Sequence, residues 1–167
     1  MRDQWGKPFV ILKIMGSFVA IAASIIAAGA IVSAEKRRVS QLLAFTALTE
    51  RLGQQIENFN TPVADILKST DPTLLRSCGA ITPNTESFLK FLDGCDLALN
   101  EEEKRALFTF GADLGRYFRS DQIKACSLCS SQLADFANDA QILFPKKRKM
   151  TYTLLICSAL ALVIILI

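Results

Sequence analysis

The sequence predicts an all-α protein, in which an antiparallel bundle of about five or six helices lies between two transmembrane helices. Two long stretches without a charged residue lie near the two ends of the 167-residue chain. Between them, apolar residues recur at the three- and four-residue spacing of helices that face a core. We find no convincing strand pattern, so a membrane-anchored helical bundle is the expected architecture.

The first uncharged stretch runs from residue 14 to residue 34 and belongs to a predicted membrane helix at 9–34, preceded by an outer flank at 1–8. Uninterrupted apolar stretches of about 18 residues or more are typical of transmembrane helices. A cleaved signal peptide is the alternative, because Val32-Ser33-Ala34 has the small-residue spacing of a cleavage site. The length of the stretch and the basic residues after it favour a retained helix.

The second stretch, residues 150–167, is apolar on every face, which favours crossing the membrane over lying flat on it. A tail in the membrane interface is the alternative. As a helix the stretch would be about 27 Å long, against a hydrocarbon core of about 30 Å.

Both stretches have a basic cluster on the side that faces the middle of the chain. The clusters comprise Lys36, Arg37 and Arg38 after the first stretch, and Lys146, Lys147, Arg148 and Lys149 before the second. Because Lys and Arg accumulate on the cytoplasmic side, they are expected to determine topology and to place the bundle, residues 35–145, in the cytoplasm. The juxtamembrane cluster 146–149 would also meet anionic lipid headgroups.

The charge of the predicted bundle argues against nucleic acid as a partner. The whole chain is +3, but residues 1–38 hold six and residues 146–149 hold four of its 19 Lys and Arg residues, and residues 39–145 carry more acidic than basic side chains. A nucleic-acid-binding domain would show the opposite balance.

Small residues form a stripe on the first predicted membrane helix, at Gly16, Ala20, Ser24 and Ala28. Small residues four apart let helices approach closely in lipid. The stripe therefore predicts pairing with a second copy of the chain or with another membrane subunit. The alternative is that it only reflects an Ala-rich composition.

The bundle is predicted to begin with a helix that continues from the first membrane helix. Its core face would consist of Leu42, Phe45, Leu48, Leu52, Ile56 and Phe59. Three short helices are expected, each with an N-cap residue followed by Pro at the first helical position, at Thr61-Pro62, Asp71-Pro72 and Thr82-Pro83, and a turn is expected at Asp93-Gly94.

Two longer helices follow. Asn100 and Glu103 form a predicted capping box for the first, whose core face would hold Leu107, Phe110, Gly111, Leu114 and Phe118. Ser120 is the predicted N-cap of the second, and Pro145 is expected to close it. Its core face would hold Ile123, Cys126, Cys129, Leu133, Phe136, Ala137, Ala140 and Phe144.

The sequence offers little for catalysis. It contains no His, which is the commonest general base and metal ligand, and no glycine-rich phosphate loop. Cys126 and Cys129 form a CxxC inside a helical pattern, which favours small buried side chains over a metal or redox site. We expect no enzyme activity, no cofactor or metal, and no small-molecule substrate.

A glycine-containing segment is the best candidate for a protein interface. Gly111 and Gly115 lie four residues apart in a predicted helix, where each glycine costs about 1 kcal/mol relative to Ala. Close packing inside the bundle and a partner surface are both consistent with this pattern. The candidate interface comprises Gly111, Leu114, Gly115, Arg116, Arg119 and Gln122.

The pattern formed by Phe110, Gly111, Leu114, Gly115 and Gln122 resembles the stage III sporulation protein AB family, as do the chain length and the two hydrophobic ends. The resemblance implies a fold similar to the cytoplasmic helical domains of type II secretion platform proteins. It also implies membership of the channel-like complex that joins mother cell and forespore, in which a related protein is a secretion-type ATPase.

Together, these features favour a non-enzymatic membrane platform on the mother-cell side of the membrane around the forespore. Its expected partners are the ATPase, other membrane subunits, membrane lipids and a second copy of itself. The alternative is a membrane-tethered adaptor or regulator of a soluble cytoplasmic partner, without a role in secretion.

Overall fold

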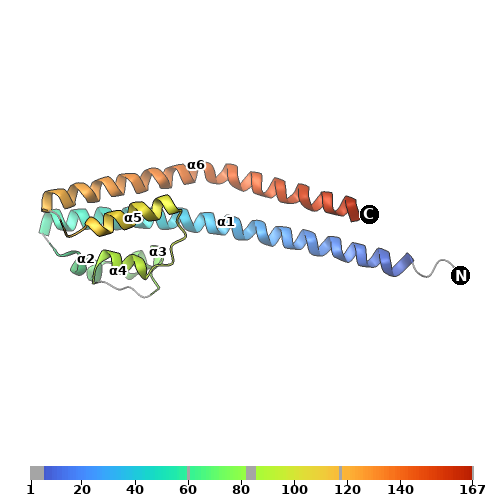
Figure 1. Cartoon of the computed structure of the whole chain (residues 1–167), viewed down its shortest axis with the longest axis horizontal. Helices are drawn as coiled ribbons and strands as arrows, with labels where there is room; N and C mark the ends of the chain where they lie inside the picture. Colours follow the sequence, from blue (N-terminus) through green and yellow to red (C-terminus); the bar gives the residue numbers. More distant parts are fainter. Residues whose placement is uncertain (1–5, 60, 82–85, 117, 167) are drawn as a thin grey trace. The chain divides into compact units, whose positions relative to one another are not determined.

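The computed structural model describes residues 6–59, 61–81, 86–116 and 118–166, and within them the fold is all-α, as predicted (Figure 1). Six helices follow one another in these ranges: α1 (Gly6–Phe59), α2 (Val63–Ser69), α3 (Pro72–Ser77), α4 (Phe88–Asp93), α5 (Glu101–Asp113) and α6 (Arg119–Leu166).

The chain divides into two compact units. One unit combines Met1–Ala34 with Leu143–Ile167, and the other is the helical bundle Glu35–Ile142. In the first unit Ala28, the last residue of the predicted small-residue stripe, is buried. The side chains of Gly16, Ala20 and Ser24 lie outside the described part of the structure.

Among the residues that the structure describes, none of the helices combines the length and the hydrophobicity that crossing a membrane requires. The two predicted membrane helices are therefore not confirmed and stay predictions.

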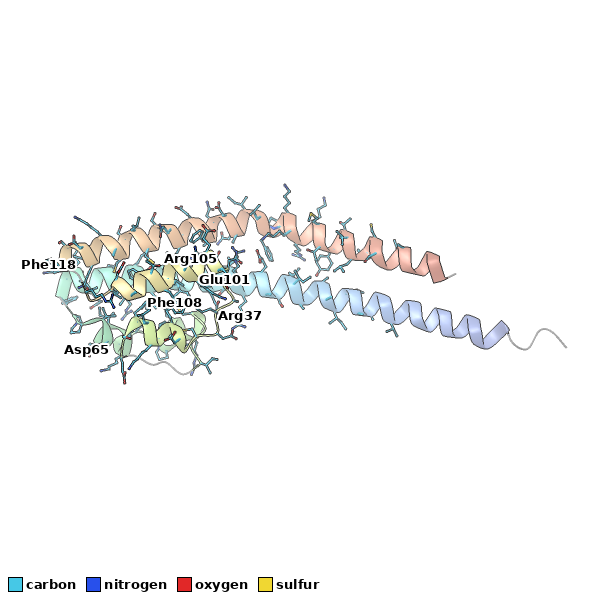
Figure 2. All side chains as sticks on the ribbon, in the orientation of Figure 1. Arg37, Asp65, Glu101, Arg105, Phe108 and Phe118 are labelled. Atoms are coloured by element: carbon cyan, nitrogen blue, oxygen red, sulfur yellow. The ribbon has the colours of Figure 1, made fainter. Side chains whose placement is uncertain are left out.

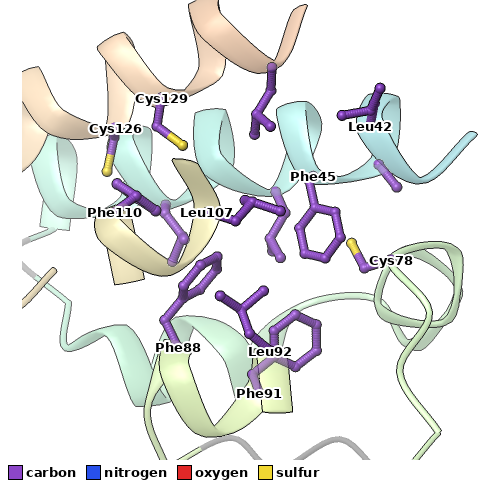
Figure 3. Close-up of a cluster of buried hydrophobic side chains, with 14 of the residues drawn as sticks. Leu42, Phe45, Cys78, Phe88, Phe91, Leu92, Leu107, Phe110, Cys126 and Cys129 are labelled. Atoms are coloured by element: carbon purple, nitrogen blue, oxygen red, sulfur yellow. The ribbon is translucent and has the colours of Figure 1, made fainter. Parts of the chain in front are cut away.

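The core of the bundle forms where α1 meets the shorter helices and the first half of α6. The α1 stripe is buried as predicted from Leu42 to Ile56, and Phe59 is the exception. Figure 3 shows Phe45 of α1 pointing toward Leu107 of α5 and Leu92 of α4, which belong to the same cluster of buried side chains. Burying an aliphatic or aromatic side chain of this size stabilises the fold by about 1.5–3 kcal/mol, so this stripe holds the bundle together.

Several helix starts agree with the sequence. The Asp71 carboxylate accepts a hydrogen bond of 2.8 Å from the backbone N–H of Thr73 at the start of α3. At the start of α5, the Asn100 backbone N–H donates to Glu103 Oε2 at 2.8 Å, and the predicted capping box is present. These contacts satisfy N–H groups that the first turn of a helix leaves without partners.

Other predicted boundaries are wrong by a residue or more. Pro62, not Thr61, occupies the N-cap position of α2, and α6 begins at Arg119, one residue before Ser120. Pro145 lies inside α6 and does not close it. Proline removes one backbone hydrogen bond, but the helical pattern resumes directly after it. The predicted start at Thr82-Pro83 lies outside the described residues.

A buried ion pair joins α1 to α5. The Arg38 guanidinium donates from Nε to both carboxylate oxygens of Glu103, at 3.1 Å each, and from Nη1 to Glu35 at 2.9 Å. The Glu103 side chain is only 2% exposed and that of Arg38 13%. Hydrogen bonding to Glu103 raises the pKa of Arg38 above its ordinary value, so the guanidinium remains charged.

Gln41, one turn later on α1, holds the segment that leads into α5. Its amide nitrogen donates to the Asp96 carbonyl oxygen at 2.7 Å, and its amide oxygen accepts from the Ala98 N–H, also at 2.7 Å. Arg37 adds an exposed ion pair with the Asp96 carboxylate at 2.7 Å. The segment 96–103 is therefore attached to α1 by polar contacts before α5 begins.

Removing the Glu103 carboxylate should destabilise the bundle far more than removing its neighbour. Glu103→Ala leaves a buried guanidinium without its main partner, which costs about 3–5 kcal/mol. Glu102 is exposed, so Glu102→Ala should change stability by less than about 0.5 kcal/mol. Urea unfolding followed by circular dichroism measures both. Equal destabilisation by the two variants would contradict the role assigned to the pair.

Candidate functional site

An open cleft lies at the end of the bundle where α1 ends and α6 begins. It has a volume of about 560 Å³, and all six residues of the predicted interface line it: Gly111, Leu114, Gly115, Arg116, Arg119 and Gln122. Its other walls come from the end of α1, the start of α2 and the start of α4. The segment predicted from sequence thus forms one surface, and residues at α1, α2 and α4 supply the rest of the cleft lining.

Gly111 allows α4 to approach α5 at the floor of the cleft. A Cβ atom on Gly111 would lie 3.1 Å from both Phe88 Cδ1 and Leu89 Cδ2. The Phe88 ring in turn meets Phe110 edge to face, with ring centroids 5.3 Å apart. The predicted close approach is therefore present at Gly111, against side chains of α4, and it gives the cleft a packed apolar floor.

Gly115 has a different role from the one predicted. It lies outside α5, which ends at Asp113, and its φ of +89° is in the left-handed region. A Cβ atom there would meet nothing within 4 Å. Glycine serves at this position because it adopts positive φ without a steric penalty, so Gly115 makes the turn and does not mark a helix crossing.

Arg119, which the sequence placed in the candidate interface, caps the end of α1. Its Nε donates to the Ile56 carbonyl oxygen at 3.1 Å, and its Nη2 donates to the Glu57 carbonyl oxygen. Both carbonyls belong to the last turn of α1, where no intrahelical donor remains. Arg119 therefore joins the start of α6 to the end of α1, which run in opposite directions (Figure 1).

Arg116 differs from Arg119 because its charge is available to a ligand. It lies in the exposed turn after α5, where its backbone N–H donates to the Asp113 carbonyl oxygen at 3.1 Å. Within the described ranges its guanidinium forms no ion pair and no side-chain hydrogen bond. A guanidinium at the rim of an apolar cleft is suited to bind a carboxylate in a bidentate manner.

Two aromatic residues at this end were missed, because the helical pattern assigned both to the core. Phe59 is 70% exposed and Phe118 is 85% exposed. Phe59 is the last residue of α1, and Phe118 immediately precedes α6, at the end of the bundle (Figure 2). Periodicity fails where a helix ends, since no neighbour continues beyond it to cover the side chain. The helix break at Thr61-Pro62 was the sequence signal that could have shown that Phe59 lies at the end of α1.

The predicted topology residues have different environments. Arg37 and Arg38 form the ion pairs described above, whereas the Lys36 side chain and those of the 146–149 cluster are exposed. The first cluster therefore contributes to the bundle as well as to any role at a membrane.

The CxxC cysteines lie in the core, as the sequence favoured. Cys126 is 1% exposed and Cys129 4% exposed. Burial raises the pKa of Cys126 to about 11 and that of Cys129 to about 12, so both are protonated thiols near neutral pH. No group of three or more His, Cys, Asp or Glu side chains in the described part of the chain is arranged to hold a metal ion.

The fold and the cleft define a helical-bundle protein with an exposed aromatic and cationic end. The family model of stage III sporulation protein AB matches residues 13–167. The chain therefore belongs to the stage III sporulation protein AB family, as the resemblance indicated, and has a role in sporulation. Comparison with curated proteins finds no match, and neither does comparison with solved structures.

The two arginines of the cleft should differ in their effect on stability. Arg119→Ala removes charge-assisted hydrogen bonds to the end of α1 and should lower the free energy of unfolding by about 1–2 kcal/mol. Arg116→Ala should change it by less than about 0.5 kcal/mol. Thermal unfolding followed by circular dichroism distinguishes them. If Arg116→Ala proved the more destabilising, the assignment of Arg119 as the cap of α1 would be wrong.

Proposed function

We propose that the protein is a membrane platform subunit of the stage III sporulation complex and docks the ATPase of that complex through the cleft at the end of its bundle. The observation that carries this proposal is the position of Arg116. Among the residues that the structure describes, its guanidinium forms no ion pair, and it lies beside a cleft with an apolar floor, in a bundle whose net charge is negative.

The composition of this end of the bundle favours a protein as the ligand. Aromatic residues and Arg are enriched in the residues that dominate protein interfaces. Phe59 and Phe118 supply exposed rings at this end, and Phe88 belongs to a packed floor that would not need to rearrange. A partner segment with an apolar side chain next to a carboxylate would fill the cleft and pair with Arg116.

The acidic remainder of the bundle would orient such a partner. A segment that carries a carboxylate would be repelled by residues such as Glu101 and Glu102 at the other end of α5 and attracted to Arg116, while Glu86 in the cleft lining is paired with Lys90. Complementary charge mainly raises specificity and the association rate. The apolar floor would then supply most of the affinity.

The membrane part of the proposal rests on the sequence alone. Residues 14–34 and 150–167 are uncharged, and each adjoins a basic cluster on the side of the bundle. This pattern is typical of two membrane helices that hold a cytoplasmic domain between them. In the sporulating cell, that side would be the mother-cell side of the membrane around the forespore.

The ATPase is proposed as the partner on the basis of the family. The chain belongs to the stage III sporulation protein AB family, and its sequence has no glycine-rich phosphate loop of its own. ATP hydrolysis would accordingly take place in the partner, and the platform would transmit its movements to the other membrane subunits.

The predicted topology is tested by cysteine labelling in intact cells. A membrane-impermeant maleimide should fail to label a cysteine placed at the exposed position Lys68 or Lys90, because the bundle would be cytoplasmic. The same positions should react after the cells are permeabilised. Strong labelling before permeabilisation would contradict the proposed topology.

The docking surface is tested by charge reversal. Arg116→Glu should abolish co-purification of the full chain with the ATPase in mild detergent, because a carboxylate would face the carboxylate of the partner. Arg76→Glu, at an exposed position of α3 outside the cleft, makes the same charge change and should retain binding. Both variants should keep the helical circular dichroism of the parent. ATPase binding by Arg116→Glu at unchanged affinity would overturn the proposed surface.

A further inference from the structure

A second groove, separate from the Arg116 cleft, runs between α5 and α6. It has a volume of about 530 Å³ and shares no lining residue with that cleft. Its α5 wall reaches from Glu102 to Asp113, and its α6 wall reaches from Ala125 to Phe136. Each wall is about 17 Å long, so the groove offers two walls of equal length to about three turns of another helix.

The middle of the groove is apolar and only partly covered. Leu128 is 63% exposed and Phe136 is partly exposed on the α6 wall, whereas the side chains of Ala106 and Thr109 on the α5 wall are small. A single exposed leucine is ordinary on a protein surface, but here it lies in one groove with a partly exposed aromatic ring. A groove of this kind accepts the apolar face of an amphipathic helix.

Arg105 gives the groove a cation whose charge is not used within the described part of the chain. It is exposed (labelled in Figure 2), and within the described ranges it forms no ion pair and no side-chain hydrogen bond. Its neighbour Lys104 differs, since it pairs with Glu101 at 2.9 Å. A carboxylate on a docked helix would accept two hydrogen bonds from the Arg105 guanidinium.

Glu102 limits which helix fits, because it places a carboxylate one turn before Arg105. Glu102 is exposed and lies about 4.5 Å from Arg105 along the axis of α5. A helix with a row of carboxylates would meet Glu102 with a like charge, whereas a helix with one carboxylate and a neutral or basic residue a turn away would not. Asp113, at the other end of the groove, already interacts within the chain, and the docking of such a helix does not require it.

We propose that this groove docks an amphipathic helix of another protein, which packs its apolar side chains on Leu128 and Phe136 and pairs one carboxylate with Arg105. The contact removes the exposed Leu128 from water, and its apolar part supplies most of the affinity. The pairing with Arg105 supplies the specificity for an acidic residue at one position of the helix. This inference does not depend on docking of the ATPase, since the two surfaces share no lining residue.

Binding of two synthetic helices to the full chain in mild detergent tests the charge pairing. The first probe is a stapled helix about 21 Å long, with leucines along one face and one Glu beside the centre of that face, and the second probe has Lys in place of the Glu. The parent should bind the Glu probe at least about fivefold more tightly. Arg105→Gln should abolish this preference and Arg105→Glu should reverse it, whereas Arg76→Glu, at an exposed position outside the groove, should retain it. Fluorescence anisotropy measures the dissociation constants.

A pair of leucine variants tests the apolar part of the groove. Leu128→Gln should raise the dissociation constants of both probes at least about tenfold, whereas Leu43→Gln, on α1 outside the groove, should leave them unchanged. Circular dichroism checks that every variant keeps its helices. The proposal is overturned if neither probe binds more tightly than about 1 mM, if the folded Arg105 variants keep the parental preference, or if Leu43→Gln weakens binding as much as Leu128→Gln. Sedimentation in which the parent self-associates and Leu128→Gln alone is monomeric would assign the groove to a second copy of the chain and overturn it as well.

Discussion

The buried ion pair between Arg38 and Glu103 is the constraint on which the arrangement of the bundle depends. Glu103 accepts hydrogen bonds from the Arg38 guanidinium and from the Asn100 backbone N–H, so one carboxylate both starts α5 and binds it to α1. A buried charge without a partner is strongly destabilising, so alternative positions of α5 along α1 are disfavoured. This contact therefore determines where α5 lies along α1, and with it the position of the Arg116 cleft at the C-terminal end of α5.

The segment before α5 is held just as tightly, and it requires a glycine. Gly79 has a φ of +96°, and its carbonyl oxygen accepts from the Asp96 N–H at 2.9 Å. A Cβ atom on Gly79 would lie 2.5 Å from Gln41 Nε2 and 2.6 Å from the Asp96 carbonyl oxygen. Neither gap accommodates a side chain, so the Gln41 contacts and the close approach of the two loops depend on each other. The Gln41 contacts hold the segment before α5 against α1, and the Arg38–Glu103 ion pair holds the first turn of α5 against α1.

Local signals in the sequence were sufficient for the helical elements but not for the surface they create. The Asp71 cap and the Asn100–Glu103 box were predictable, because each is formed within a few residues. The exposure of Phe118 and the role of Arg119 were not, because both depend on where the end of α1 lies in space. Likewise, the spacing of the two glycines predicted the same role for both. In the structure, Gly111 leaves room for the side chains of α4, whereas Gly115 adopts a positive φ.

The first basic cluster shows how one set of charges serves at two stages in the proposed membrane topology. Orientation is decided as the chain inserts, when the Lys and Arg residues beside a membrane helix act through their charge alone. Afterwards Arg38 becomes buried against Glu103, and Arg37 pairs with Asp96. Reversing the charges of Arg37 and Arg38 would therefore alter folding and orientation together, and the two effects could not be told apart.

Lys36 is exposed and forms no ion pair in the part of the chain that the structure describes. Lys36 is thus where the contribution of charge to topology can be measured without disturbing the bundle.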